Sequence, residues 1–255
     1  MLNFISNIQI LLNFYPKKII AGLRNLPYFY RCKKAFKKSL GNDPDFKISR
    51  NYFCLTDMNE ASGNLPKHYF LQDLYFAQKI VENKPTKHVD IGSRIDGFVA
   101  HLASFMEVEV LDVRPLKNTI KNVRFIQADL MDCNFHLNNY CASVSCLHVI
   151  EHLGLGRYGD TIDAQGHLKG LDTIYKLLQA GGYFYFSVPI GNQRIEYNAH
   201  RIFSVDYLLN YFSSKYELLS FSYLDDDDVM HENIDPGNEI IPCRFGCGLF
   251  IWKKI

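Results

Sequence analysis

Long apolar stretches are missing from this 255-residue sequence. No run approaches the ~18 apolar residues that a membrane-spanning helix needs, so no transmembrane segment is expected. The first twenty residues lack a basic start and a small-residue cleavage site, and Asn13 interrupts their apolar segment, which argues against a signal peptide. Internal repeats and low-complexity segments are also absent. Since 47% of the residues are hydrophobic, a globular protein with a substantial core is expected.

Regularly paired cysteines are missing as well. The seven cysteines follow no disulfide pattern, and a chain of this length needs no disulfides to fold. Reduced thiols and a cytoplasmic location are therefore expected. Cys243 and Cys247 form a single C-x-x-x-C pair without a second pair or a nearby histidine, which is a weak zinc pattern. No metal site is predicted.

Acidic side chains are absent from residues 1–40, which carry eight basic ones, whereas residues 41–255 have a net charge of −7. Apolar residues at helical spacing precede the basic ones, so residues 1–65 should form a basic helical extension and a covering loop. Two interpretations remain open. The extension either contacts the inner membrane face or a glycan-assembly protein, or packs on the domain with a solvated basic face. The apolar positions are Phe4, Ile8, Leu11 and Tyr15, and the basic ones are Lys17, Lys18, Arg24, Arg31, Lys33, Lys34, Lys37 and Lys38.

Strand and helix patterns alternate along residues 66–255. Helices are predicted at 66–82, 98–105 and 168–179, and strands at 88–91, 107–111, 123–127, 142–147 and 183–188. Two more strands, 216–223 and 248–252, should form a closing antiparallel hairpin. The fold class is therefore α/β, with a Rossmann-like, seven-stranded, mostly parallel sheet in a domain of residues 66–255 and an N-terminal helical extension.

Acidic residues end the first three predicted strands. Asp90 is followed by Gly92 and Ser93, where a missing side chain lets the backbone approach a ligand. Asp112 could accept hydrogen bonds from both hydroxyls of a ribose, and Asp129, followed by Leu130, could meet an adenine amino group. Each carboxylate alone could be a helix cap or a solvated loop residue. Together, about 20 residues apart, they predict a nucleoside-bearing cofactor.

These segments resemble the class I S-adenosylmethionine-dependent methyltransferases. HVDIGS resembles their first motif, EVLDVRP the acidic second-strand motif, FIQADL the adenine-side motif, and LLQAGGYFYFSVP the helix, turn and fifth strand. The sequence is most similar to a little-studied branch, catalogued as a domain of unknown function and found among bacterial surface-polysaccharide genes and in nematodes. That similarity lies in SCLHVIEHLGLGRYGD, the turn at 163–166, FSVPIG and YNAHRIFS. It covers about residues 66–255 and implies S-adenosylmethionine as the cofactor.

The glycine-rich loop departs from the family pattern. The family usually has glycine at alternate positions after the acidic residue, and this chain keeps only Gly92 in place. Arg94 stands where a glycine is usual, so it could narrow the methionine end of the pocket or reach the methionine carboxylate. S-adenosylmethionine has no phosphate, so it needs fewer glycines than a dinucleotide does.

The segment after the fourth strand holds the candidate catalytic residues. His148, Glu151 and His152 match the H-x-x-E-H zinc-protease pattern, but they follow a strand and precede glycines, so a zinc helix is not predicted. On a methyltransferase they could orient the acceptor or take its proton. His152 beside Glu151 is the first choice and His200 the second. The alternative for each histidine is to tie a loop to backbone carbonyls.

Arg157, Tyr158 and Asp160 lie in a glycine-rich loop that should line an acceptor pocket. Arg157 together with Arg201 could hold a phosphate or a carboxylate, as in a sugar nucleotide. The alternative is a loop held by an Arg–Asp pair. Loop carboxylates near this site could also bind Mg²⁺, but their spacing alone does not predict a metal site.

The resemblance implies methyl transfer to an oxygen of a saccharide or sugar-nucleotide precursor of a surface glycan, as in capsule polysaccharide biosynthesis. The expected partners are this acceptor and, through residues 1–40, a membrane or a glycan-assembly protein; nucleic acid is not expected, because no basic cluster recurs near the candidate active face. Two alternatives stay open. One is an N-methyltransferase acting on a small amine or a phospho-amino alcohol, and the other is a catalytically silent methyltransferase-fold scaffold.

Overall fold

The computed structural model describes residues 16–41, 46–56, 67–132, 137–237 and 241–255. The chain forms two compact units, Met1–Leu65 and Pro66–Ile255, and each is described by itself. The apolar positions predicted from Phe4 to Tyr15 lie outside the described residues. In the part that is described, no helix is long and apolar enough to cross a membrane.

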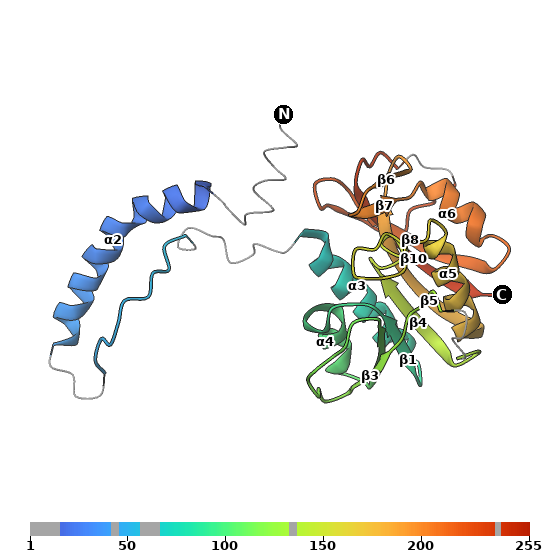
Figure 1. Ribbon diagram of the computed structural model, residues 1–255, viewed down its shortest axis with the longest axis horizontal. Helices are drawn as coiled ribbons and strands as arrows, with labels where there is room; N and C mark the ends of the chain where they lie inside the picture. The colour runs from blue at the N-terminus through green and yellow to red at the C-terminus, as the bar shows by residue number, and fades with distance from the viewer. Residues whose placement is uncertain (1–15, 42–45, 57–66, 133–136, 238–240) are drawn as a thin grey trace. The chain divides into compact units, whose positions relative to one another are not determined.

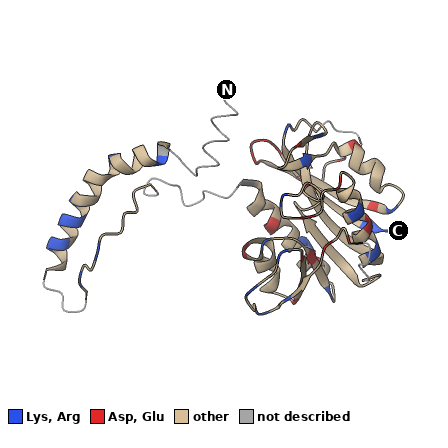
Figure 2. Ribbon diagram, in the orientation of Figure 1, with Lys and Arg blue, Asp and Glu red and all other residues tan. Residues whose placement is uncertain are grey.

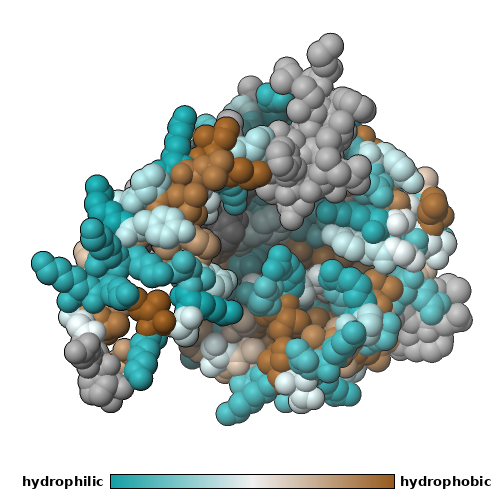
Figure 3. All heavy atoms as spheres, turned by 60° about the vertical axis from the view of Figure 1, so that its left-hand side comes forward, coloured by the Kyte–Doolittle hydropathy of each residue, from teal (hydrophilic) through white to brown (hydrophobic). Residues whose placement is uncertain are grey.

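The first unit contains helix α2 (Pro16–Leu40), which confirms the predicted N-terminal helix. Pro27 lies inside it and cannot donate the backbone hydrogen bond that this turn would otherwise have. The helix packs against residues 46–56, because Asn25 Nδ2 donates to the Leu55 carbonyl at 2.7 Å and the Phe29 and Phe53 rings lie 5.0 Å apart. Figure 2 shows lysine and arginine residues at several places along this helix. On the left of Figure 3, hydrophobic and hydrophilic side chains lie side by side.

The second unit is built on one mixed sheet, in the order β3-β2-β1-β4-β5-β10-β8-β9 (Figure 1). The first five strands are parallel, and β10 lies antiparallel between β5 and β8, which confirms the predicted fold class. A two-residue edge strand, β9, adds to the seven predicted. The bounds are β1 His88–Ile91, β2 Val108–Asp112, β3 Val123–Gln127, β4 Cys141–Leu147, β5 Leu178–Ile190, β8 Tyr216–Leu224, β9 Met230–His231 and β10 Gly246–Lys254.

Helices cover both faces of this sheet, which is why β1 is buried along its whole length. On one face, Phe76 of α3 (Lys67–Asn83) and Phe98 of η1 (Ile95–Val99) belong to one core, near α4 (Ala100–Ala103). On the other face, Ile174 of α5 (Gly166–Leu177) and Phe212 of α6 (Val205–Phe212) belong to a second core. At the end of the sheet where β1–β4 have their carboxyl ends, the chain forms loops.

Three elements differ from the sequence prediction. The helix predicted at 98–105 is instead η1 followed by the four-residue α4, because Gly97 adopts a non-helical conformation. The helix predicted at 168–179 ends at Leu177, where the extended Leu178 begins a longer β5. The hairpin of β6 (Arg194–Glu196) and β7 (His200–Ile202) and helix α6, capped by the Ser204 hydroxyl, were not predicted.

Candidate functional site

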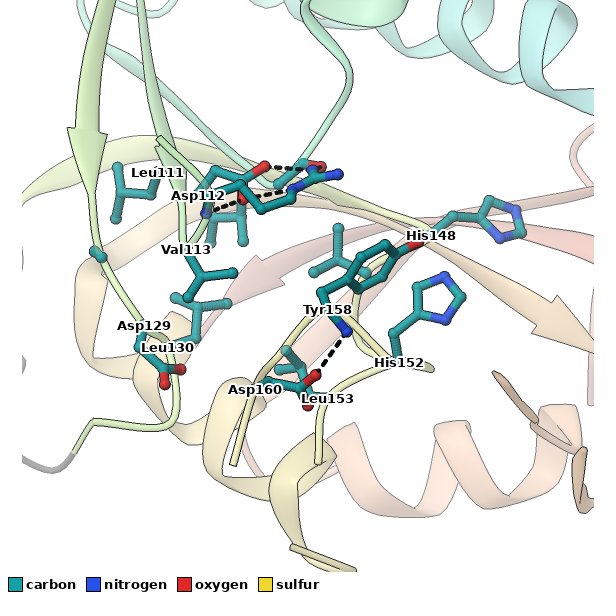
Figure 4. A pocket seen from close by; sticks show the side chains of 15 residues that line it. Leu111, Asp112, Val113, Asp129, Leu130, His148, His152, Leu153, Tyr158 and Asp160 are labelled. Carbon is teal, nitrogen blue, oxygen red and sulfur yellow. Dashed lines mark hydrogen bonds and ion pairs between the residues drawn. The ribbon is translucent and has the colours of Figure 1, made fainter. Parts of the chain in front are cut away.

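A pocket of about 630 Å³ opens at the carboxyl ends of the parallel strands. It lies beside β1, which has β2 on one side and β4 on the other, so the strand order reverses there. Open α/β sheets bind ligands at such a switch point. The described lining, shown in Figure 4, is Ile91, Gly92, Leu111, Asp112, Val113, Arg114, Ala128, Asp129, Leu130, His148, Val149, His152, Leu153, Tyr158 and Asp160.

Gly92 makes the turn after β1 close to the pocket. Its φ of +70° favours glycine, and its N–H donates to the Leu111 carbonyl at 2.8 Å. A Cβ atom at this position would lie 2.9 Å from Cγ2 of Val149 on the other side of the pocket. The turn therefore brings bare backbone to the pocket lining.

Asp90 and Ser93 lie buried behind this turn and are not among the residues that line the pocket. Asp90 is fully buried, and its carboxylate accepts hydrogen bonds from Ser145 Oγ at 2.6 Å and Ser93 Oγ at 2.9 Å. Burial raises the pKa of Asp90 to about 7. Ser145 also contacts His88 Nε2 at 2.9 Å, and burial lowers the pKa of His88 to about 3. A direct ligand contact was predicted for Asp90 and Ser93, but the buried network uses their polar atoms.

Arg94 does not narrow the pocket. Its side chain is 79% exposed and forms a two-pronged pair with Asp96, with distances of 3.0 Å from Nε and 2.7 Å from Nη2. This pair holds the pKa of Asp96 below its usual value. The bulky residue in the glycine-poor loop is therefore directed to its own neighbour and is not among the residues that line the pocket.

Asp112 is paired with an arginine that sequence reasoning did not single out. Its Oδ1 accepts from the Arg114 backbone N–H at 2.8 Å and from Nε at 3.0 Å, and Oδ2 accepts from Nη2. Asp129 lines the same pocket and accepts from the Met131 N–H at 2.8 Å. Figure 4 shows both carboxylates at the strand-end side of the cavity. The only sequence signal for Arg114 is its place two residues after the strand-ending acid.

His148, Glu151 and Cys247 form a buried chain of contacts. His148 Nδ1 lies 2.8 Å from Glu151 Oε1, and its Nε2 lies 3.2 Å from Cys247 Sγ on β10. Burial lowers the pKa of His148, but Cys247 and Glu151 raise it well above its usual value overall. Burial alone would raise the pKa of Glu151, yet His148 and His152 lower it. We therefore treat His148 and Glu151 as an imidazolium–carboxylate pair.

His152 has one ring nitrogen committed and one available. Nδ1 lies 2.7 Å from the Ala199 carbonyl, which can only accept, so Nδ1 carries the proton. Nε2, the basic nitrogen of this tautomer, lies 3.7 Å from Glu151 Oε1. Burial lowers the pKa of His152, so the ring is neutral near pH 7. Its ring meets the Tyr158 ring edge-on at 5.5 Å (Figure 4).

The loop after His152 is held by Asp160. The Asp160 carboxylate accepts from the N–H groups of Gly154 at 2.8 Å, Gly156 at 3.3 Å and Tyr158 at 3.1 Å. Asp160 also lines the pocket, but these bonds give it a shaping role. Tyr158 is half-exposed and has two guanidinium groups at 5.2 Å from its ring centre, those of Arg114 and Arg157.

Arg201 does not join Arg157 in an anion site, contrary to the prediction. It is 4% exposed, and its guanidinium donates to the carbonyls of Glu151 at 3.3 Å, Leu153 at 2.7 Å and Ala164 at 3.3 Å. The charge is therefore used to hold loops together. The loop after His152 is therefore held by the Arg201 guanidinium, through these carbonyls, as well as by Asp160.

His200 is also away from the pocket lining. Its ring packs on Phe245 at 4.9 Å, and Nε2 lies 3.3 Å from Glu196 Oε2. Residues 148–152 form turns and not the helix that the H-x-x-E-H zinc pattern requires. Among the described residues, no group of three or more His, Cys, Asp or Glu side chains could hold a metal ion.

Comparison with solved structures identifies the fold. The chain is similar to Burkholderia thailandensis 1,6-didemethyltoxoflavin-N1-methyltransferase, solved with S-adenosylhomocysteine, at a TM-score of 0.53, with 12% identity, 73% of this chain and 78% of that one covered. It is also similar to the [4+2]-cyclase SpnF, at a TM-score of 0.52, with 12% identity and coverage of 82% and 85%.

A third similar structure is the N-methyltransferase NodS from Bradyrhizobium japonicum with S-adenosylhomocysteine, at a TM-score of 0.50, with 12% identity and coverage of 87% and 97%. At such identities these structures establish the methyltransferase fold alone.

No curated protein sequence matches the chain. Residues 102–232 match the sequence model of a family described as Caenorhabditis protein of unknown function, DUF268. Because this match spans half of the 255 residues, the protein belongs to the DUF268 family.

Proposed function

We propose that the Pro66–Ile255 domain binds S-adenosylmethionine and catalyses transfer of its methyl group to an oxygen of an acceptor. The observation that carries the proposal is the pocket at the switch point of the sheet, which brings together Gly92, Asp112 and Asp129. Gly92 contributes backbone without a side chain to the pocket lining, and the two carboxylates are acceptor-only groups suited to hydroxyl and amino donors. The residues present therefore fit this cofactor.

In this proposal Asp112 holds the two ribose hydroxyls and Asp129 holds the adenine amino group, next to the apolar Leu130. Arg114 fills three of the roughly four acceptor sites of the Asp112 carboxylate, so one ribose hydroxyl takes the free site on Oδ2 and the second takes a site that an Arg114 N–H gives up. When bound, the cofactor supplies an electrophilic methyl group on a sulfonium centre. The protein then contributes mainly alignment of the acceptor with that methyl group.

We assign His152 as the base that takes the proton of an acceptor hydroxyl. Its Nδ1–H is fixed on the Ala199 carbonyl, so the free lone pair belongs to Nε2. Glu151, at 3.7 Å, stabilises the charge that His152 gains, and His148 holds Glu151 in place. His148 is a positioning residue, and we assign His200 no proton transfer because it lies away from the pocket lining.

For the acceptor we propose a nucleotide-linked or phosphorylated sugar of a surface glycan. Arg114 and Arg157 flank Tyr158, and because Arg114 is paired with Asp112, Arg157 supplies the charge beside an aromatic ring that can stack on a sugar or a base. The glycan itself rests on the sequence resemblance. Methylation of a small amine is the second candidate, since two of the similar structures are N-methyltransferases. A silent or non-methylating domain is the third, since SpnF is a cyclase.

The test is calorimetric titration of the protein with S-adenosylhomocysteine, comparing wild type with Asp112→Ala. Asp96→Ala is a matched control, because Asp96 forms the same two-pronged pair with an arginine two residues away, outside the pocket. We expect micromolar binding in wild type and in the control and about 100-fold weaker binding in Asp112→Ala, from two charge-assisted hydrogen bonds of ~1.5 kcal/mol each.

Absence of binding to folded wild-type protein would contradict the proposal and favour the silent scaffold. If binding is found, production of S-adenosylhomocysteine should be measured with a panel of sugar nucleotides and small amines. Mass spectrometry of the product then distinguishes oxygen from nitrogen methylation.

A further inference from the structure

The Met1–Leu65 unit exposes large apolar side chains. Leu23 is 62% exposed, Phe36 59% and Tyr52 73%. Single exposed apolar residues are common on protein surfaces, but a concentration of them in one small unit indicates a contact surface. The other exposed large apolar side chains here are Ile19, Ile20, Tyr28, Tyr30, Phe46, Ile48 and Phe53.

Several of these side chains share one face of α2. At 100° per residue, Ile19, Ile20, Leu23 and Tyr30 fall on one side of the helix. Asn25 and Phe29, which contact residues 46–56, fall on the other side, and half-buried Gly22 and Lys33 lie between these two residues and the apolar face. The apolar face is thus turned away from the only other described segment of its own unit.

The same unit is strongly basic. Residues 16–41 and 46–56 contain ten Lys and Arg and no Asp or Glu, and residues 1–65 as a whole carry a net charge of +6. The basic residues gather in the second half of α2, after the apolar face, and continue on residues 46–56 (Figure 2). The exposed ones are Lys18, Arg24, Arg31, Lys34, Lys37, Lys38, Lys47 and Arg50.

We propose that residues 16–41 and 46–56 dock on the surface of an anionic lipid bilayer, with α2 lying in the plane of the interface. Aliphatic and aromatic side chains next to lysines and arginines are the composition of interfacial helices. The helix has 25 residues and is therefore about 37 Å long, and its eight basic residues prevent it from crossing the bilayer.

Charge and apolar exposure together distinguish a bilayer from other occupants. A second copy of this unit would bring a like charge of +6 and be repelled. A nucleic acid would engage the lysines and arginines but would leave Ile20 and Leu23 in water. An anionic bilayer satisfies both, since headgroup phosphates meet the basic side chains and acyl chains meet the apolar face.

The experiment is sedimentation of the full chain with vesicles of phosphatidylcholine containing about 30 mol% phosphatidylglycerol, compared with pure phosphatidylcholine. The charge variant is Arg31→Gln/Lys34→Gln/Lys38→Gln, and the apolar variant is Ile20→Ser/Leu23→Ser. We expect the charge variant to lose on the order of 100-fold in partitioning onto anionic vesicles, at about fivefold per basic residue. The apolar variant should lose at least about tenfold with all charges kept.

The matched control is Lys84→Gln/Lys121→Gln/Lys176→Gln, which removes three exposed lysines from the other unit and should change partitioning less than about twofold. Absence of binding to anionic vesicles, equal binding to neutral ones, or an unaffected charge variant would each overturn the proposal. So would equally tight binding to duplex DNA that the apolar variant retains. Titration of all variants with S-adenosylhomocysteine keeps this result separate from the enzymatic proposal.

Discussion

Replacing Gly92 by alanine should destabilise the Pro66–Ile255 domain by two separable amounts. The first is the conformational cost of an alanine at φ +70°, about 1–2 kcal/mol. The second is overpacking, because the new Cβ would lie 2.9 Å and 3.2 Å from the two methyl groups of Val149, and this costs about 1–3 kcal/mol. Val149 is half-buried and can yield partly, so a total loss of about 3 kcal/mol is expected.

Two further variants separate the two amounts. Gly181 has a φ of +73° and no atom within 4 Å of its added Cβ, so Gly181→Ala should lose only the conformational part, about 1–2 kcal/mol. The double variant Gly92→Ala/Val149→Ala removes the methyl groups that collide. Its loss should therefore be about 1–3 kcal/mol smaller than the sum of its two single variants.

The measurement is the free energy of unfolding by urea at 25 °C for wild type, the three single variants and the double variant, followed by thermal unfolding. For a domain of this size each kcal/mol corresponds to roughly 2–4 °C, so Gly92→Ala should melt roughly 6–12 °C lower. If the two substitutions were additive within about 0.5 kcal/mol, the collision with Val149 would be refuted. If Gly181→Ala were as damaging as Gly92→Ala, backbone conformation alone would explain the loss.

Three other variants test the buried network and the histidines. Asp90→Asn should gain stability relative to wild type as pH rises from 5 to 8, because a folded pKa of about 7 against the usual 3.8 means that wild type loses about 2.5 kcal/mol over that range; parallel urea profiles at these pH values would contradict this. His152→Gln should slow methyl transfer, measured by product formation, by at least about 100-fold. Its affinity for S-adenosylhomocysteine, measured by calorimetry, should stay within about twofold of wild type. Unchanged turnover would show that His152 is not the base. Cys247→Ala should lower the pKa of His148, followed by NMR titration of its ring, and an unchanged value would show that Glu151 alone sustains the charge.

The sheet could be predicted from the sequence because its parallel strands are apolar runs separated by polar or helical segments. The segments 88–91 and 123–127 were predicted with their observed bounds. The start of β5 was not, since Gly181 and Gly182 lie in an irregular pairing with β4 that periodicity does not reveal. The 194–202 hairpin has two strands of three residues each, most of them polar, so it gives almost no hydrophobic signal.

The candidate site could be predicted only in part. Strand ends fix where Asp112 and Asp129 lie, so their meeting at one pocket followed from the fold. The role of Arg201 did not, because its partners are backbone carbonyls from two other loops, and any residue has a carbonyl. The contact of Cys247 with His148 joins residues 99 positions apart, and nothing local marks it.

Arg201 also affects how the acceptor side of the domain moves. Its side chain joins the 194–202 hairpin to the loop after β4, and the Ala199 carbonyl returns contacts from His152 and Arg157. Neither segment can open without exposing the other's buried polar groups, so both should behave as a single cooperative unit in native-state hydrogen exchange. Because His152, Leu153 and Tyr158 line the pocket, opening of that unit would change this wall of the pocket in one step.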